Sequence, residues 1–163
     1  MQYWRGLEIR MLGAFSMEFE GRPVQLSMKL SAKPVQLLLL LLAAGEAGLS
    51  RHAIVEALFD QESENDAASS LNVAVSRLRK ILRDSGLPKE KYIHTRIDRY
   101  YFECPFPLWV DTQEIESLRQ SADVAKGTDR SGLLYQLCYI VGGRFLPDLD
   151  GEDWVDVYRA QYQ

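Results

Sequence analysis

The sequence predicts an α+β fold in which a small antiparallel sheet comes before three helices and a β-hairpin. Residues 7–11 and 15–19 alternate apolar and polar side chains with a period of two, which is typical of half-buried strands, and a turn then leads into 23–26. Residues 69–83 instead place their apolar side chains at helical spacing. Residues 92–103 indicate two short strands around a tight turn.

Two helices are expected between the sheet and the stretch with helical spacing. Residues 32–44 indicate the first, since Pro34 is tolerated in a first turn and a glycine follows the segment. Because the leucines of 37–42 face all directions, we expect this to be the central buried helix. The second helix starts after Ser50, a suitable N-cap residue.

The third helix, expected at about 67–83, combines an apolar stripe with a basic face. The stripe consists of Leu71, Val75, Leu78 and Leu82. Away from it lie the candidate contact residues Asn72, Val73, Ser76, Arg77, Lys80 and Arg83, with Arg79 at its border. The hairpin adds two arginines at or near its tip, Arg96 and Arg99. A basic helix followed by a basic hairpin is what a winged helix-turn-helix presents to DNA.

The net charge of −4 is unusual for a DNA-binding protein, but the charges are unevenly distributed. Basic residues outnumber acidic ones between Leu71 and Arg99, whereas acidic residues gather at 56–66 and after Asp111. The local field matters more than the total charge for contact with a polyanion. The acidity still predicts weak non-specific affinity, since that affinity is mostly phosphate neutralisation.

The sequence contains no pattern typical of a metal site, a cofactor site or a membrane-spanning segment. Cys104 and Cys138 have no C-x-x-C spacing, and His52 and His94 are well separated, so we expect no metal site, no cofactor and two reduced, buried cysteines in a cytoplasmic protein. The run 37–42 is far shorter than the roughly 20 apolar residues that cross a bilayer. No secretory signal is visible, so a membrane partner is not expected.

Enzyme motifs are missing from the sequence. It contains no nucleotide-binding glycine loop, no G-x-S-x-G elbow and no H-E-x-x-H pair. Carboxylates are plentiful but scattered, so nothing forces two of them into one cleft. The sequence therefore predicts that the protein is not an enzyme.

The pattern becomes helical after the prolines at 105–107. Asp111 and Glu114 form a D-x-x-E capping box, which predicts the start of a helix. The glycines of 127–132 are expected to break this helix. Two further helices are expected at 133–141 and 153–162.

The order of the elements resembles the OmpR/PhoB-type winged-helix domain of response regulators. The V-x-V-x-I-x-R-L-R-K-x-L helix pattern of that family is matched by Leu71, Val73, Val75, Arg77, Leu78, Arg79, Lys80 and Leu82. Its Arg-Gly-x-Gly-Tyr wing looks like 96–100, where Ile97 and Arg99 replace the two glycines. The tip of this wing must therefore turn differently.

Within that superfamily the chain is more similar to SARP-type activators, whose winged helix is followed by a helical bacterial transcriptional activator domain. The match to the start of the activator domain is carried by Phe145, Leu146, Pro147, Asp153 and Trp154. The resemblance implies a winged-helix domain at 1–107 and the start of a tetratricopeptide-like activator domain at 108–163. Because such arrays need several stacked units, we expect the chain to be part of a longer regulator.

The resemblance implies a sequence-specific DNA-binding transcriptional regulator, with the helix 67–83 in the major groove and the wing 92–103 at the adjacent minor groove. Base readout needs side chains that reach base edges: Arg77 suits guanine, Asn72 suits adenine, and Val73 suits a thymine methyl group. The expected phosphate contacts are Ser76, Arg79, Lys80 and Arg83, and either Arg96 or Arg99 would enter the minor groove. The alternative for each is an ordinary solvated surface.

Double-stranded DNA is therefore the expected partner. The acidic loop 60–66 is either a contact for RNA polymerase, as the resemblance implies, or a non-interacting loop. A homodimer or tandem binding on repeated half-sites is expected, because one small module buries little DNA surface. The alternative function is a winged-helix protein-interaction module that does not bind DNA by itself.

Overall fold

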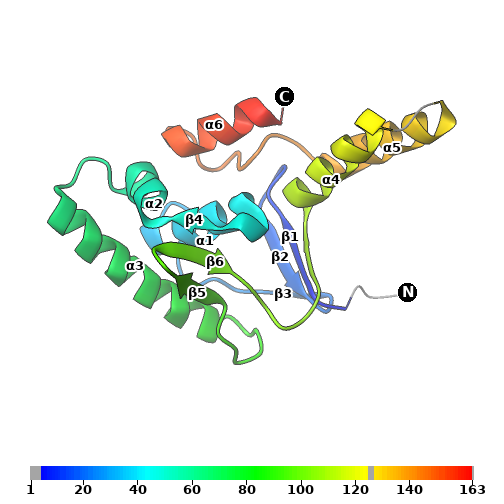
Figure 1. Ribbon diagram of the computed structural model, residues 1–163. Helices are drawn as coiled ribbons and strands as arrows, with labels where there is room; N and C mark the ends of the chain where they lie inside the picture. The colour runs from blue at the N-terminus through cyan, green and yellow to red at the C-terminus, as the bar shows by residue number, and fades with distance from the viewer. Residues whose placement is uncertain (1–4, 125–126, 163) are drawn as a thin grey trace. The chain divides into compact units, whose positions relative to one another are not determined.

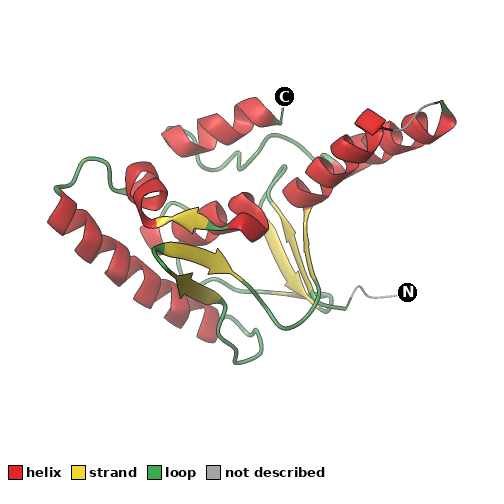
Figure 2. Ribbon diagram, in the orientation of Figure 1, coloured by secondary structure: helices red, strands yellow, loops and turns green. Residues whose placement is uncertain are grey.

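The computed structural model describes residues 5–124 and 127–162, which form two compact units (Figure 1). The winged-helix unit is Val24–Phe106, and the sheet–helix unit joins Met1–Pro23 to Pro107–Gln163. The strands form two separate sheets, one in each unit (Figure 2). This mixture of helices and sheets confirms the predicted fold class.

The winged-helix unit consists of three α-helices and a three-stranded sheet. Its helices are α1 (Lys33–Ala44), α2 (Arg51–Leu58) and α3 (Glu64–Arg83), with a short 3-10 turn, η1 (Gly45–Ala47), after α1. The strands run in the order β4-β6-β5, with bounds Leu49–Ser50, Arg99–Phe102 and Ile93–Arg96. Figure 1 shows α3 beside the β5–β6 hairpin. The sequence did not predict β4, a two-residue strand that pairs antiparallel with β6.

Helix α1 forms the centre of this unit. All residues from Leu37 to Leu42 are buried, which confirms the central helix expected from its all-round apolar pattern. Its first turn contains Pro34, as predicted. Both α2 and α3 pack against α1, and these contacts bury the apolar stripe of α3.

Two serine caps fix the starts of α2 and α3. The Ser50 side chain accepts a hydrogen bond from the Ala53 N–H at 3.1 Å, and the Ser63 side chain accepts one from the Asp66 N–H at 3.3 Å. Helix α3 therefore starts at Glu64, so the predicted loop 60–66 is too long and the predicted helix start is three residues late. Glu64 and Asp66 lie in the first turn, where the helix dipole favours negative charge.

The sheet–helix unit is built on a four-stranded sheet in the order β3-β2-β1-β7. The first three strands, β1 (Leu7–Arg10), β2 (Ser16–Phe19) and β3 (Arg22–Pro23), form the antiparallel sheet that the sequence predicts, but β3 ends at Pro23 instead of extending over 23–26. Strand β7 (Leu108–Val110) pairs parallel to β1. We expected helix rather than strand after residue 107, and a parallel pairing between segments so distant in sequence leaves no local signal.

The units group residues differently from the predicted division at 107. The N-terminal sheet lies in the same unit as the segment that follows Pro107. The assignment of 1–107 to DNA binding and 108–163 to an activator domain stays a prediction, since compactness does not show what either segment does.

Asp111 has a different role from the predicted capping box. Its buried carboxylate accepts hydrogen bonds from the N–H groups of Met11 and Leu12 at 2.9 Å, and from the Thr112 N–H at 2.8 Å. Met11 lies 100 residues away, so Asp111 ties the chain between β1 and β2 to the start of α4 (Asp111–Val124). Burial raises the pKa of Asp111, and these three donors partly offset that rise.

The remaining helices of this unit are α5 (Thr128–Ile140), which packs against α4, and α6 (Asp153–Gln161). Helix α5 starts directly after Gly127 and includes Gly132, so the expected break over 127–132 is wrong in its extent. Phe145 is buried beside Trp154, with ring centroids 6.3 Å apart in an edge-on arrangement. These two aromatic residues of the activator-domain match are therefore core residues.

The structure bears on the expectations about the cysteines, a metal site and a membrane only in the residues that it describes. Cys104 is a free thiol, half-buried rather than buried, and burial raises its pKa. The side chain of Cys138 lies outside the described residues. Within 5–124 and 127–162, no group of three His, Cys, Asp or Glu side chains is arranged to hold a metal ion. No helix in the same ranges is both long and apolar enough to cross a bilayer.

Candidate nucleic-acid interface

Helix α3 presents one continuous exposed face, which we call the α3 face. It consists of Asn72, Val73, Ser76, Arg77, Lys80 and Arg83, all exposed. Their spacing places them on one side of the helix, while the opposite side is buried. Val73 is 48% exposed, so its apolar side chain is available for contact outside the core. The structure therefore brings together six of the nine predicted site residues.

Arg79 differs from the other basic residues of α3. It is only half-buried, and its Nη2 donates a hydrogen bond to the carbonyl oxygen of Ile93 at 3.1 Å. This bond ties the C-terminal half of α3 to strand β5. Its Nε is buried without a hydrogen-bond partner. The phosphate contact expected of Arg79 stays a prediction, and its bond to Ile93 also gives it a structural role in the wing.

The tip of the wing is a two-residue turn formed by Ile97 and Asp98. Both have positive φ angles, +43° and +58°, as a type I′ hairpin turn requires. Ile97 and Asp98 therefore adopt the left-handed backbone conformation that glycines would adopt more easily. This conformation is strained for the β-branched side chain of Ile97. Ile97 is also 98% exposed, so an apolar side chain stands at the end of the wing.

Arg96 is held by two neighbours on the hairpin. It forms an ion pair with Glu103, with an Nη2–Oε2 distance of 3.0 Å, and its guanidinium lies over the Tyr101 ring at 5.0 Å from the centroid. The hydrogen bond from Arg96 holds the pKa of Glu103 below its ordinary value. Both partners are exposed enough for water and ions to weaken the pair.

Arg99 is anchored to the backbone of the winged-helix unit. Its Nη2 donates to the carbonyl oxygens of Ala47 at 2.9 Å and Gly48 at 3.2 Å, and its Nε donates to Ala47 at 3.3 Å. These bonds fix β6 beside the turn that precedes β4. Of the two wing arginines predicted for the minor groove, Arg96 is therefore the one that can turn outward at lower cost.

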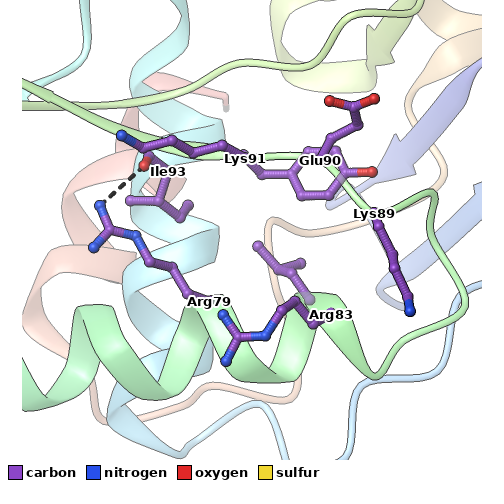
Figure 3. A pocket seen from close by; sticks show the side chains of 8 residues that line it. Arg79, Arg83, Lys89, Glu90, Lys91 and Ile93 are labelled. Atoms are coloured by element: carbon purple, nitrogen blue, oxygen red, sulfur yellow. Dashed lines mark hydrogen bonds between the residues drawn. The ribbon is translucent and has the colours of Figure 1, made fainter.

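A basic cavity of about 370 Å³ lies between the C-terminal half of α3 and the loop before β5. Figure 3 shows its principal lining residues, Arg79, Arg83, Lys89, Glu90, Lys91 and Ile93. The two arginines reach into the cavity from α3, while the Glu90 carboxylate points away from them (Figure 3). Four positive side chains and one carboxylate thus surround the same space.

The loop that carries the two lysines is held in place by its own side chains. The Tyr92 hydroxyl donates to the carbonyl oxygen of Pro88, and the Ser85 hydroxyl donates to that of Leu82 at 2.7 Å. Burial raises the pKa of Tyr92 to about 12, so its hydroxyl stays a donor at neutral pH. The cavity is therefore formed by ordered elements on both sides.

Sequence reasoning missed Glu103, Lys89 and Lys91 as parts of the site. The strand alternation could have found Glu103, because β pairing places Arg96, Tyr101 and Glu103 on one face of the hairpin. Lys89 and Lys91 contributed to the basic surplus, but nothing local in the sequence placed them opposite α3.

Residues 25–101 match the family described as "Transcriptional regulatory protein, C terminal". This match spans α1 to α3 and nearly all of the hairpin. The chain carries a winged-helix domain of the OmpR/PhoB type. The members of this family are transcription-regulator domains, not a class of enzymes.

A solved structure gives the second comparison for this winged-helix protein. The structure of "Mycobacterium tuberculosis EmbR in complex with low affinity phosphopeptide" matches with a TM-score of 0.73 and 21% sequence identity. The match covers 97% of this chain and 42% of the EmbR chain. At this identity the likeness shows the fold. Curated protein sequences give no significant match.

The family match agrees with the predicted transcription regulator of the OmpR/PhoB type, and the structural match shows the fold. The family match covers the winged helix, and the structural match extends the likeness over the helices that follow it. The winged-helix fold and the class of transcription regulator are thus established.

Proposed function

We propose that this chain is a sequence-specific DNA-binding transcriptional regulator, with α3 in the major groove and the β5–β6 wing at the adjacent minor groove. The α3 face carries the proposal, because a helix can read bases only with side chains that no core contact occupies. Arg77, Asn72 and Val73 supply the three chemistries that major-groove edges recognise, and Lys80 and Arg83 supply phosphate contacts.

The contacts within the wing refine the roles proposed for its arginines. Arg96 would enter the minor groove after leaving Glu103, and the phosphate-rich surroundings would favour the free cation. Arg99 would keep its bonds to Ala47 and Gly48 and contribute to the shape of the wing. Ile97 would contact the sugar walls of the groove from the tip.

The proposal extends to two further partners. The acidic segment before α3, residues 60–63, is our candidate contact for RNA polymerase. Glu62 in this segment accepts a hydrogen bond from the Ser70 hydroxyl at 2.9 Å. We also propose dimeric or tandem binding on repeated half-sites, since one such module covers little DNA. The segment 108–163 is proposed as the start of an activator domain.

The test is a selection of bound duplexes from a random pool, followed by measured affinities of two variants. Arg77→Gln should weaken binding to the selected duplex by about 1–3 kcal/mol and leave binding to unrelated duplexes nearly unchanged. Lys80→Gln should weaken binding to all duplexes alike and reduce the salt slope by about 1. A repeat of the selected motif at one helical turn would support the tandem arrangement.

The second candidate function is protein binding without DNA readout. The net charge of −4 and the occupied wing arginines favour it. A pool that stays flat after selection, combined with equal effects of the two variants on every duplex, would replace the DNA proposal with this one.

A further inference from the structure

The basic cavity joins cations from two segments of the winged-helix unit. Arg79 and Arg83 are four residues apart on α3, so they project from the same side of the helix one turn apart. Lys89 and Lys91 come from the opposite wall, on the loop before β5. Four cationic side chains therefore line one cavity, and their combined positive field favours an anion within it.

The charges in this cavity are not neutralised by the protein. No ion pair involves Arg83, Lys89 or Lys91 in the part of the chain that the structure describes. Glu90 is the one carboxylate of the lining, and Figure 3 shows it directed away from both arginines. The Nε–H of Arg79 is buried and has no hydrogen-bond partner. A small rotation of the guanidinium would let this group donate a hydrogen bond to an oxyanion in the cavity.

The size and chemistry of the cavity define the ligand further. About 370 Å³ is at the lower end of the range of small-molecule sites, and it exceeds the volume of a single phosphate group. Tyr92 and Ile93 also line the cavity, but both side chains are almost fully buried, so the exposed side chains of Arg83, Lys89 and Lys91 supply most of the surface that a ligand meets. Arginine side chains bind phosphate oxygens in pairs, and lysines add point charges.

We propose that the basic cavity is a binding site for a phosphate group with an organic substituent. Arg79 and Arg83 hold the phosphate oxygens from α3, Lys91 and Lys89 close the site from the loop, and the aliphatic stems of these side chains contact the substituent. The ligand comes from one of two sources. It is either a free phosphorylated small molecule or a backbone phosphate of DNA bound along α3, and the second source alone rests on the proposed function.

The test measures binding of inorganic pyrophosphate to this polypeptide in the absence of DNA. Calorimetric titration at about 50 mM salt gives the affinity, and the NMR signals of the arginine Nε–H groups locate the site. The pocket variant is Arg83→Gln with Lys91→Gln. The matched control is Lys29→Gln with Arg130→Gln, which removes one lysine and one arginine charge from exposed positions outside the cavity.

Saturable binding is expected, with the largest shift at Arg79 Nε–H. The pocket variant should bind at least about tenfold more weakly, while the control keeps the wild-type affinity. Equal losses in both variants, or no saturable binding to the wild type, would overturn the proposal. Because no DNA is present, this result does not depend on whether the protein binds DNA.

A second arm separates the two sources with a selected duplex, or with a random one if no duplex is enriched. If a DNA phosphate fills the cavity, saturating pyrophosphate weakens duplex binding, and the pocket variant lowers the salt slope by about 1 relative to the control. If pyrophosphate binds in the cavity while duplex binding and its salt slope stay unchanged, a free phosphorylated molecule is the ligand.

Discussion

Replacing Asp111 by alanine removes the shared acceptor of three backbone N–H groups. The carboxylate is fully buried and accepts hydrogen bonds from Met11, Leu12 and Thr112 at 2.8–3.0 Å. Met11 and Leu12 are also buried, so their N–H groups would have no water to replace the lost acceptor. The substitution therefore acts on the link between the first strands and the start of α4.

The expected loss follows from these contacts. An unsatisfied buried N–H costs about 1–3 kcal/mol, so two of them lower the free energy of unfolding by about 3 kcal/mol after partial relaxation. At about 3 °C per kcal/mol for a chain of this size, the Tm falls by about 9 °C. Asp111→Asn keeps one acceptor oxygen and should lose about 1 kcal/mol.

Urea unfolding followed by tryptophan fluorescence measures this effect, because Trp109 and Trp154 lie in the same unit as Asp111. The matched control is Asp123→Ala, an exposed position on the same helix, which should change stability by less than about 0.5 kcal/mol. If Asp111→Ala lost no more stability than this control, the carboxylate would not be the link that the hydrogen bonds indicate.

Three further predictions concern the wing and the last helix. Ile97→Asn should raise stability by about 1 kcal/mol in thermal melts, because asparagine tolerates the left-handed turn better; a decrease would mean that Ile97 is not strained. Arg159→Ala should lower the free energy of unfolding by about 2–3 kcal/mol, since Arg159 is 11% exposed and donates to the carbonyl oxygens of Phe145 and Leu146; a change below about 0.5 kcal/mol would contradict this. The pKa of the Glu103 carboxyl, measured by NMR, should lie below its ordinary value and rise in Arg96→Ala. As the pH falls through that lowered pKa, Glu103 becomes protonated, the ion pair is lost and Arg96 is freed. If the pKa of Glu103 were the same in Arg96→Ala as in the wild type, the ion pair would not exist in solution.

The local patterns of the sequence determined the helices and the first strands. Apolar residues at 37–42 face every side of α1, and this alone indicated that the helix is central. The alternation at 7–11 placed β1, and Ser50 marked the start of α2. These signals could be read because helix and strand periodicities, and caps, involve residues only a few positions apart.

The same reasoning identified much of the α3 face. The apolar stripe of α3 fixed which residues are buried, and the exposed residues followed by exclusion. Within that face the roles of Arg77 and Lys80 stay predictions. The hydrogen bond of Arg79 was not predicted, because its partner, the carbonyl oxygen of Ile93, lies on a strand whose distance from α3 the sequence does not encode locally.

What the tertiary structure alone decided are the contacts between distant segments. Strand β7 pairs with β1 although the whole winged-helix unit lies between them in the sequence, and Asp111 accepts hydrogen bonds from backbone groups about 100 residues away. The partners of Arg96 and Arg99 and the opposed walls of the basic cavity also depend on how the hairpin folds back. The sequence by itself determined the helices of the winged-helix unit, the first strands and the faces that these elements bury, but neither β4 nor β7. Side-chain partners were decided by the fold, since hydrogen bonds and ion pairs require distances that no periodicity carries.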